Sequence, residues 1–109
     1  MEFMEEKIVT EGVRVSLTIE GKEVGRARLY LIKNDLHDRP YGLFEDLFVN
    51  EEARGFGYGT KIVEKIIETA KKYNCYKLIG TSRYERKRVH ALYEKFGFTD
   101  YGKEFRMDL

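Results

Sequence analysis

A glycine-rich loop between a strand pattern and the longest amphipathic helix pattern constrains the fold of this chain most. The strand pattern runs from Leu43 to Val49, and glycines follow at alternate positions, as Gly55, Gly57 and Gly59. Glycine lets the backbone approach a ligand without a Cβ atom in the way, and a helix start offers unpaired N–H groups and the positive end of the helix dipole. The order of strand, glycine loop and helix therefore predicts a site for a phosphate or pyrophosphate.

Two helices are predicted by the spacing of apolar residues. After the loop they recur at i, i+1, i+4, i+5 and i+8, with charged residues between them: Ile62, Val63, Ile66, Ile67 and Ala70. A second helix is indicated by spacing i, i+3, i+4 and i+7, with Gly97 in the favoured position just past its end: Val89, Leu92, Tyr93 and Phe96.

The remaining segments predict strands. Gly12–Glu20 and Glu23–Ile32 surround a glycine turn and should form an antiparallel hairpin. Asn74 should end the first helix, after which Cys75–Thr81 forms a strand parallel to the central one, and Phe98–Leu109 returns as a final strand or hairpin edge. The order βββαβαβ predicts an α/β fold with a mixed, largely antiparallel sheet and two flanking helices.

Composition limits the possible functions. A chain of 109 residues should form one domain, and its 20 basic and 19 acidic residues give no overall attraction to nucleic acid or to a membrane. Cys75 is the only cysteine, which excludes an internal disulfide and a cysteine-based zinc cluster, and no metal is expected. Since no signal peptide and no run of ~18 apolar residues is present, we expect a cytoplasmic protein.

Residue order excludes the common nucleotide loops. A P-loop ends in Gly-Lys-Ser/Thr, whereas Gly59 is followed here by Thr60 and then Lys61. A dinucleotide loop needs its last glycine where this chain has Thr60, and no acidic residue closes a strand about twenty residues later.

Two motifs together resemble the GNAT superfamily of N-acetyltransferases. The first is Arg54-x-x-Gly57-x-Gly59, and the second is Leu92-Tyr93 followed by Gly97-Phe98. The resemblance implies acetyl-CoA as co-substrate and direct transfer of its acetyl group to an amine. It places the pyrophosphate on the N–H groups of Arg54 to Thr60 and the pantetheine arm beside Leu47 to Val49. The implied coenzyme-binding residues are Leu47, Phe48, Val49, Arg54, Gly55, Phe56, Gly57, Tyr58, Gly59, Thr60 and Arg86.

The same resemblance implies a general acid, and the central strand offers a base. Tyr93 matches the tyrosine that protonates the leaving thiolate in the family, although a tyrosine at this helical spacing can also be only a core residue. Glu45 shares a face with Leu47 and Val49 if the strand alternates regularly, and its apolar neighbours would strengthen it as a base. Asp46 and a water molecule are the alternatives.

Arg86 stands where many members of the superfamily have asparagine. Some members instead read Arg-x-x-Ala-His-x-Phe-Tyr, and the run from Arg86 to Tyr93 resembles that version. The basic run Arg83–Arg88 can then form a cationic rim for the coenzyme phosphates or a solvated helix start. His90 is expected to stabilise the fold.

The acceptor side is expected to be open. The short turn Glu20–Glu23 leaves no room for the helices that the family usually has between its first two strands. We therefore expect that a second subunit of a homodimer completes the site, or that a protein or peptide tail is the acceptor. A small-molecule amine and a protein or peptide amine are both expected acceptor classes. A non-catalytic acyl-CoA-binding module or sensor is the competing hypothesis. A small RNA-binding protein is a weaker one.

Overall fold

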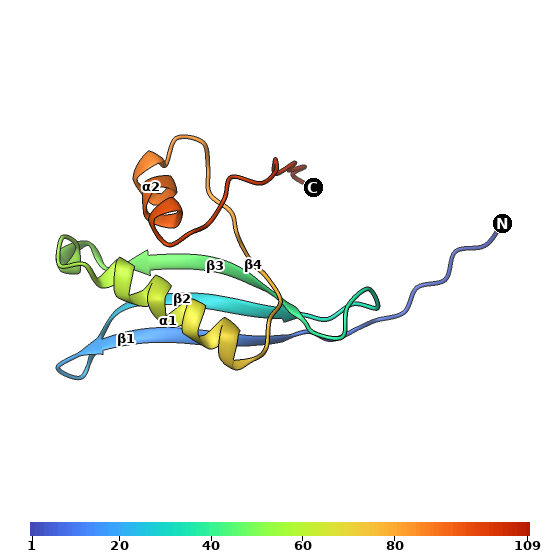
Figure 1. The fold of residues 1–109 in the computed structure, drawn as a ribbon, viewed down its shortest axis with the longest axis horizontal. Helices are drawn as coiled ribbons and strands as arrows, with labels where there is room; N and C mark the ends of the chain where they lie inside the picture. Colours follow the sequence, from blue (N-terminus) through green and yellow to red (C-terminus); the bar gives the residue numbers. More distant parts are fainter. The chain divides into compact units, whose positions relative to one another are not determined.

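The computed structural model describes residues 1–109 and contains four strands, two α-helices and one short 3-10 helix. The strands form one sheet in the order β1-β2-β3-β4 (Figure 1). Residues 1–79 and 80–109 form two compact units, each described by itself below. Neither helix has the length and apolar character needed to cross a membrane. The elements are β1 Glu11–Ile19, β2 Lys22–Ile32, β3 Tyr41–Val49, η1 Glu51–Ala53, α1 Tyr58–Lys72, β4 Leu78–Gly80 and α2 Lys87–Lys95.

The predicted hairpin is confirmed. β1 and β2 pair antiparallel, from Glu11 opposite Leu31 to Ile19 opposite Lys22. The two residues between the strands, Glu20 and Gly21, have φ values of 51° and 80°. Positive φ at both turn positions gives the backbone twist that joins two strands tightly.

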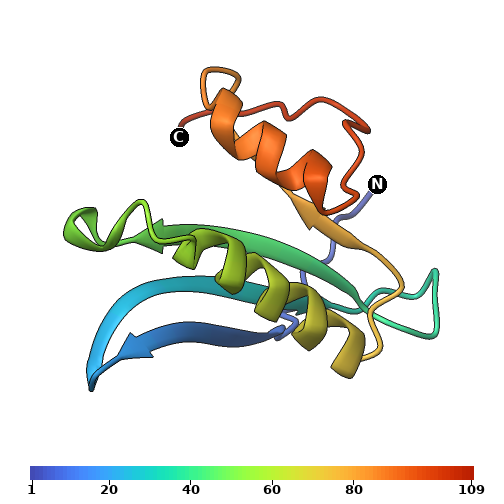
Figure 2. The ribbon, with the colours of Figure 1, turned by 60° about the vertical axis from the view of Figure 1, so that its left-hand side comes forward.

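Helix α1 lies along one face of the first three strands (Figure 2). Four of the five predicted apolar residues of this helix are buried, and Ile67 is half-buried. A Cβ atom on Gly25 of β2 would lie 2.6 Å from Ile62 Cδ1, so glycine allows the start of α1 to approach the sheet closely. Full burial of each large apolar side chain contributes roughly 1.5–3 kcal/mol. The buried apolar residues are Val24, Ala27, Leu29, Leu31, Phe44, Ala53, Ile62, Val63, Ile66 and Ala70.

A bulge in β3 breaks the regular alternation that the sequence predicted. Arg26 lies opposite Phe48 and Arg28 opposite Glu45, so Ala27 of β2 alone faces Asp46 and Leu47. Asp46 has a φ of 59°. The extra residue reverses the faces of the side chains beyond it.

The bulge therefore places Glu45 and Val49 on opposite faces, and the predicted shared face of Glu45 with Val49 is wrong. Val49 lies opposite Gly25, on the side of α1. Glu45 lies opposite Arg28, on the other side, because the neighbouring Ala27 and Leu29 are fully buried under α1.

The chain after α1 is less regular than predicted. The strand expected at Cys75–Thr81 is reduced to β4, and the strand or hairpin edge expected at Phe98–Leu109 is absent. That prediction is wrong because a strand pattern forms a strand only where a neighbour accepts its hydrogen bonds, and no backbone hydrogen bond involves residues 99–109. Four large apolar side chains of this segment are exposed: Tyr101, Phe105, Met107 and Leu109.

Candidate active site

The glycine loop has the backbone geometry of a ligand cradle. Gly55 and Gly57 have φ values of 88° and 80°, and Gly57 is the N-cap residue of α1. Side chains disfavour this left-handed region, yet a Cβ atom at either position would meet nothing within 4 Å. Glycine is thus required by the backbone conformation, and the space beside the loop is open.

The N–H groups of residues 55–60 are all unused within the chain. No hydrogen bond inside the structure takes a donor from them, and no side chain caps α1. The first backbone bond at the helix start runs from the Lys61 N–H to the Gly57 carbonyl at 3.2 Å. Unpaired donors at the positive end of a 15-residue helix form a site for an anion. These donors fit the pyrophosphate that the sequence predicts here.

Arg54 connects the loop to the end of β3. Its Nε donates a hydrogen bond to the Val49 carbonyl at 2.9 Å, and its guanidinium lies 5.7 Å from the centre of the Phe48 ring. Arg26 approaches the same ring at 4.7 Å. This hydrogen bond shows that Arg54 shapes the loop.

Asp46 and Glu45 have different electrostatic surroundings. Asp46 accepts a hydrogen bond from Arg26 Nε at 3.0 Å and is also paired with Arg28. The hydrogen bond from Arg26 lowers the pKa of Asp46, and the charges of Arg26 and Arg28 lower it further. Glu45 is exposed and takes part in no ion pair. Asp46 is therefore the weaker base, and Glu45 has the carboxylate that is available to accept a proton.

Tyr93 lies in the second unit, on α2. Gly97 ends this helix with a φ of 96°, and the chain then turns back so that the Phe98 ring lies 5.2 Å from the Tyr93 ring. Burial raises the pKa of Tyr93, and the charge of Arg86 partly opposes this shift. The phenol therefore keeps its proton to a higher pH than a free tyrosine, so it holds a proton to donate but is a weaker acid.

His90 stabilises the start of the same unit. The ring Nε2 of His90 lies 2.8 Å from the Arg83 carbonyl oxygen. The backbone N–H of His90 donates to the carbonyl of Arg86, the N-cap residue of α2. This agrees with the structural role expected for His90.

Most of the predicted residues of the first unit follow one another along the chain, from the end of β3 through η1 to the start of α1. The side chain of Thr60 does not cap the helix, because Gly57 occupies the N-cap position. Phe56 is 68% exposed, and its ring lies 5.8 Å from that of Tyr58.

The ion pairs of Asp46 with Arg26 and Arg28 were not predicted from the sequence. The i, i+2 spacing of the arginines indicates a shared strand face, but no sequence pattern indicates the bulge that brings Asp46 to them.

Strand, open glycine loop and helix together define an acetyltransferase fold of the GNAT type, and comparison with known proteins agrees. The model of the Acetyltransferase (GNAT) family matches residues 3–98. The chain therefore belongs to this family.

Three relatives illustrate the similarity. A glucosamine 6-phosphate N-acetyltransferase of Trypanosoma brucei brucei is 32% identical over 90 residues, which are 82% of this chain and 59% of that protein. A probable glucosamine 6-phosphate N-acetyltransferase 2 of Oryza sativa subsp. japonica is 39% identical over 61 residues, 56% of this chain and 35% of that protein. The solved structure of a putative acetyltransferase from Agrobacterium tumefaciens superimposes with a TM-score of 0.80 at 36% identity, over 86% of this chain and 66% of that one. The chain thus spans less than two thirds of these three relatives.

Proposed function

We propose that this chain is an N-acetyltransferase that transfers the acetyl group of acetyl-CoA to an amine. The observation that supports this most strongly is the run of unused N–H donors at residues 55–60, which opens α1 with two glycines at positive φ. Acetyl-CoA carries a pyrophosphate that fits these donors, and its thioester supplies the transferred group.

The end of β3 offers a second contact for the coenzyme. The Gly42 N–H donates to the Lys77 carbonyl, and the Tyr76 N–H donates to the Pro40 carbonyl, so the chain around β4 pairs beside the start of β3. β4 has only three residues against nine in β3. The backbone of Leu47 to Val49 therefore extends past β4, and an extended pantetheine arm can pair there like an added strand.

Two side chains have the proton-transfer roles in this proposal. Glu45 accepts a proton from the attacking amine, directly or through water, as the amine nitrogen forms a bond to the acetyl carbon. Tyr93 donates its proton to the sulfur as the carbon–sulfur bond breaks. A backbone N–H near Phe48 or Val49 stabilises the oxygen of the acetyl carbonyl.

The proposed acceptor is an amino-sugar phosphate. Two relatives are named glucosamine 6-phosphate N-acetyltransferases, and a small amine of this kind needs no peptide groove. A protein or peptide amine is the second candidate, because within residues 1–79 helix α1 lies on the sheet face opposite to Arg26 and Arg28.

Assembly and location complete the proposal. A homodimer would cover the open acceptor side, and half-buried Cys75 as the sole thiol fits a reducing cytoplasm.

The test has two stages. Calorimetry with coenzyme A and acetyl-CoA measures binding, and a thiol-release assay then compares glucosamine 6-phosphate, glucosamine and peptides with free amines. We expect coenzyme binding and the fastest thiol release with glucosamine 6-phosphate. Binding without thiol release from any amine would support the acyl-CoA-binding module instead, and no binding at all would revive an RNA-binding role.

A further inference from the structure

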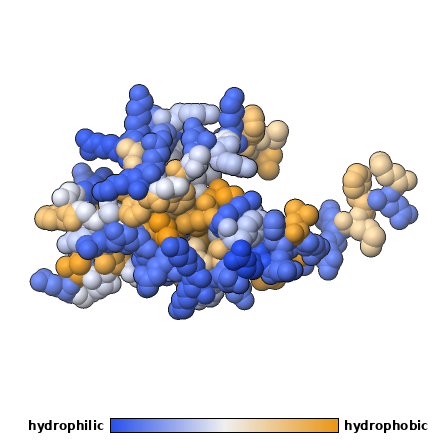
Figure 3. Space-filling model, viewed as in Figure 1, coloured by the Kyte–Doolittle hydropathy of each residue, from blue (hydrophilic) through white to orange (hydrophobic).

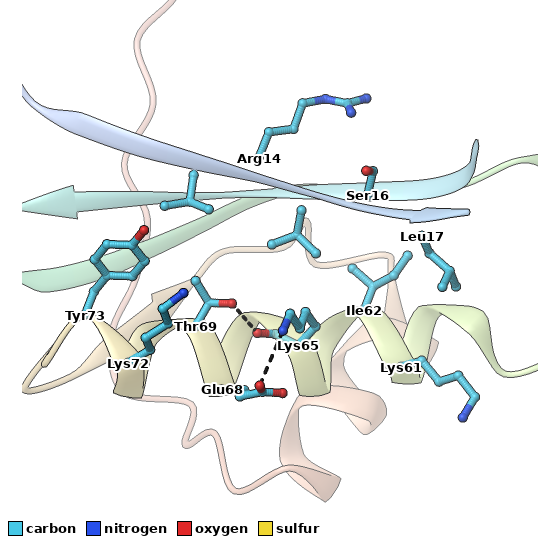
Figure 4. A pocket seen from close by; sticks show the side chains of 12 residues that line it. Arg14, Ser16, Leu17, Lys61, Ile62, Lys65, Glu68, Thr69, Lys72 and Tyr73 are labelled. Carbon is cyan, nitrogen blue, oxygen red and sulfur yellow. Dashed lines mark hydrogen bonds and ion pairs between the residues drawn. The ribbon is translucent and has the colours of Figure 1, made fainter. Parts of the chain in front are cut away.

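A groove runs between the edge strand β1 and helix α1. It has a volume of about 570 Å³ and is bordered by β1 on one side and by one stripe of α1 on the other (Figure 4). In Figure 4, Leu17 points from β1 toward the helix and Lys72 reaches from the helix toward β1, whereas Arg14 points away. The lining residues are Val13, Arg14, Val15, Ser16, Leu17, Lys61, Ile62, Lys65, Glu68, Thr69, Lys72 and Tyr73.

The β1 side of this groove is incompletely buried. Ala27 and Leu29 of β2 are fully buried under α1, but their partners on β1, Val15 and Val13, are only half-buried. β1 ends the sheet, so alternate residues along its nine-residue length direct N–H and C=O groups outward without a strand partner. A long, apolar, unpaired edge is a template for another strand.

The N-terminal segment, residues 1–10, makes no backbone hydrogen bond to the rest of the chain. It forms no helix or strand, and its apolar side chains are exposed. Figure 3 shows apolar and charged side chains along it, away from the folded part of the first unit. The apolar residues are Met1, Phe3, Met4, Ile8 and Val9.

This segment cannot easily pair with its own β1. Only Val9 and Thr10 separate Ile8 from the start of β1. A two-residue hairpin turn requires positive φ, which β-branched residues disfavour. A segment that pairs with β1 of a second copy needs no such turn.

Charge also matches the segment to the groove. Lys61, Lys65 and Lys72 border the groove on α1 against a single carboxylate, Glu68. Lys65 pairs with Glu68 at 3.3 Å, whereas Lys61 and Lys72 form no ion pair. The N-terminal segment has three glutamates and one lysine: Glu2, Glu5, Glu6 and Lys7.

We propose that the N-terminal segment of a second copy of this chain adds to the β1 edge and fills the groove, so that two copies exchange strands. In an extended segment Glu2, Met4, Glu6 and Ile8 share one face. With this face toward α1, Met4 and Ile8 cover Val13, Val15 and Leu17, and Glu2 and Glu6 face the lysines of α1. This gives the homodimer proposed above a contact surface at the β1 edge and the α1 face, and it rests on that homodimer but not on coverage of the sheet face with Arg26 and Arg28.

Charge reversal tests the exchange in the full chain. One variant changes Glu2, Glu5 and Glu6 to Lys, and the other changes Lys61, Lys65 and Lys72 to Glu. Light scattering after gel filtration should give wild-type particles of twice the 12.9 kDa chain mass. Each variant alone should be monomeric at the same concentration, since its segment and groove then have like charges. An equimolar mixture should regain dimers, because each segment then meets an oppositely charged groove.

Controls separate charge from folding. Lys71→Glu, which changes the neighbour of Lys72 outside the groove lining, should leave the dimer intact. The variant with Glu2, Glu5 and Glu6 changed to Lys alters only residues outside every helix and strand. Its thermal melt should therefore match that of wild type at a concentration where both are monomeric.

The outcomes distinguish this inference from the catalytic proposal. A strictly monomeric wild type overturns the homodimer and the exchange together, while coenzyme binding and turnover are measured separately. A dimer that survives both charge reversals, or a mixture that stays monomeric, overturns the exchange alone. If Phe105→Asp were monomeric while the variant with Glu2, Glu5 and Glu6 changed to Lys stayed dimeric, the contact would belong to the C-terminal segment and the exchange would be overturned.

Discussion

Tyr93 is the residue whose surroundings best match a proton donor. A phenol with the ordinary tyrosine pKa of 10.0 is already protonated at neutral pH, and burial raises the pKa of Tyr93 further. Tyr93→Phe keeps the ring beside Phe98 and removes only the hydroxyl. We expect turnover to fall by about a hundredfold, the lower end for a lost general acid, with coenzyme A affinity unchanged. Steady-state kinetics and calorimetry measure the two effects. Equal turnover in both proteins at every pH would refute the acid role.

Glu45 and Asp46 are adjacent in sequence but should respond differently to loss of charge. Glu45→Gln removes the available carboxylate, so turnover should fall and its acidic limb should disappear from the pH–rate profile. Asp46→Asn removes a carboxylate that is already bound to Arg26 and Arg28, so the acidic limb should remain. The pH dependence of kcat in the two variants makes the comparison. If the acidic limb of the pH–rate profile disappeared in Asp46→Asn but not in Glu45→Gln, Asp46 would be the base.

The ion pairs of Asp46 should also make stability depend on pH. Because the folded-state pKa of Asp46 is below its ordinary value of 3.8, its stabilising contribution is complete above that value. It is lost as pH falls through the lowered folded-state pKa, where the carboxylate becomes protonated. The difference in melting temperature between wild type and Asp46→Asn should therefore be constant near neutral pH and shrink below about pH 4. A difference that does not vary with pH would mean that the ion pairs do not form in solution.

At the scale of elements, the β3–loop–α1 segment offers a comparison of two glycines. Gly57 and Gly21 both have a φ of 80°, and at both a Cβ atom would meet nothing within 4 Å. Alanine at either position should cost about 1 kcal/mol of folding free energy, because the left-handed backbone is strained. Only Gly57→Ala should also weaken coenzyme A binding, by about tenfold or more, since it displaces the N–H donors at the start of α1. Denaturant unfolding and calorimetry on both variants provide the measurement. Equal coenzyme A affinity in the two variants would contradict binding of the coenzyme by the N–H groups at the start of α1.

The sequence predicts these elements where local chemistry alone determines them. The glycine spacing fixes the loop, the 3.6-residue period fixes α1, and Glu20-Gly21 fixes the hairpin turn, because each depends on neighbouring residues. The bulge at Asp46 depends instead on how β2 and β3 align, so alternation placed Glu45 on the wrong face. The segment after Gly97 alternates like a strand, yet forms none without a neighbouring strand to accept its hydrogen bonds.

At the scale of the whole molecule, the predicted site residues belong to both compact units. Residues 1–79 contain the coenzyme loop and Glu45, while residues 80–109 contain Tyr93. Coenzyme binding through the loop should therefore depend on the first unit, and turnover on both. Calorimetric affinity and turnover report on these two parts separately, as in the test of Tyr93→Phe.

The proposed dimer adds a dependence on concentration. If a second copy covers the open acceptor side, the dimer should have the higher turnover, so activity per mole of chain should rise with protein concentration through the range in which dimers form. Coenzyme A affinity per chain should stay constant over that range, because the N–H donors of residues 55–60 belong to a single chain. Activity and light scattering over one dilution series test this. If activity per chain stays constant while dimers dissociate, the acceptor site is complete within one copy, even if strands are exchanged.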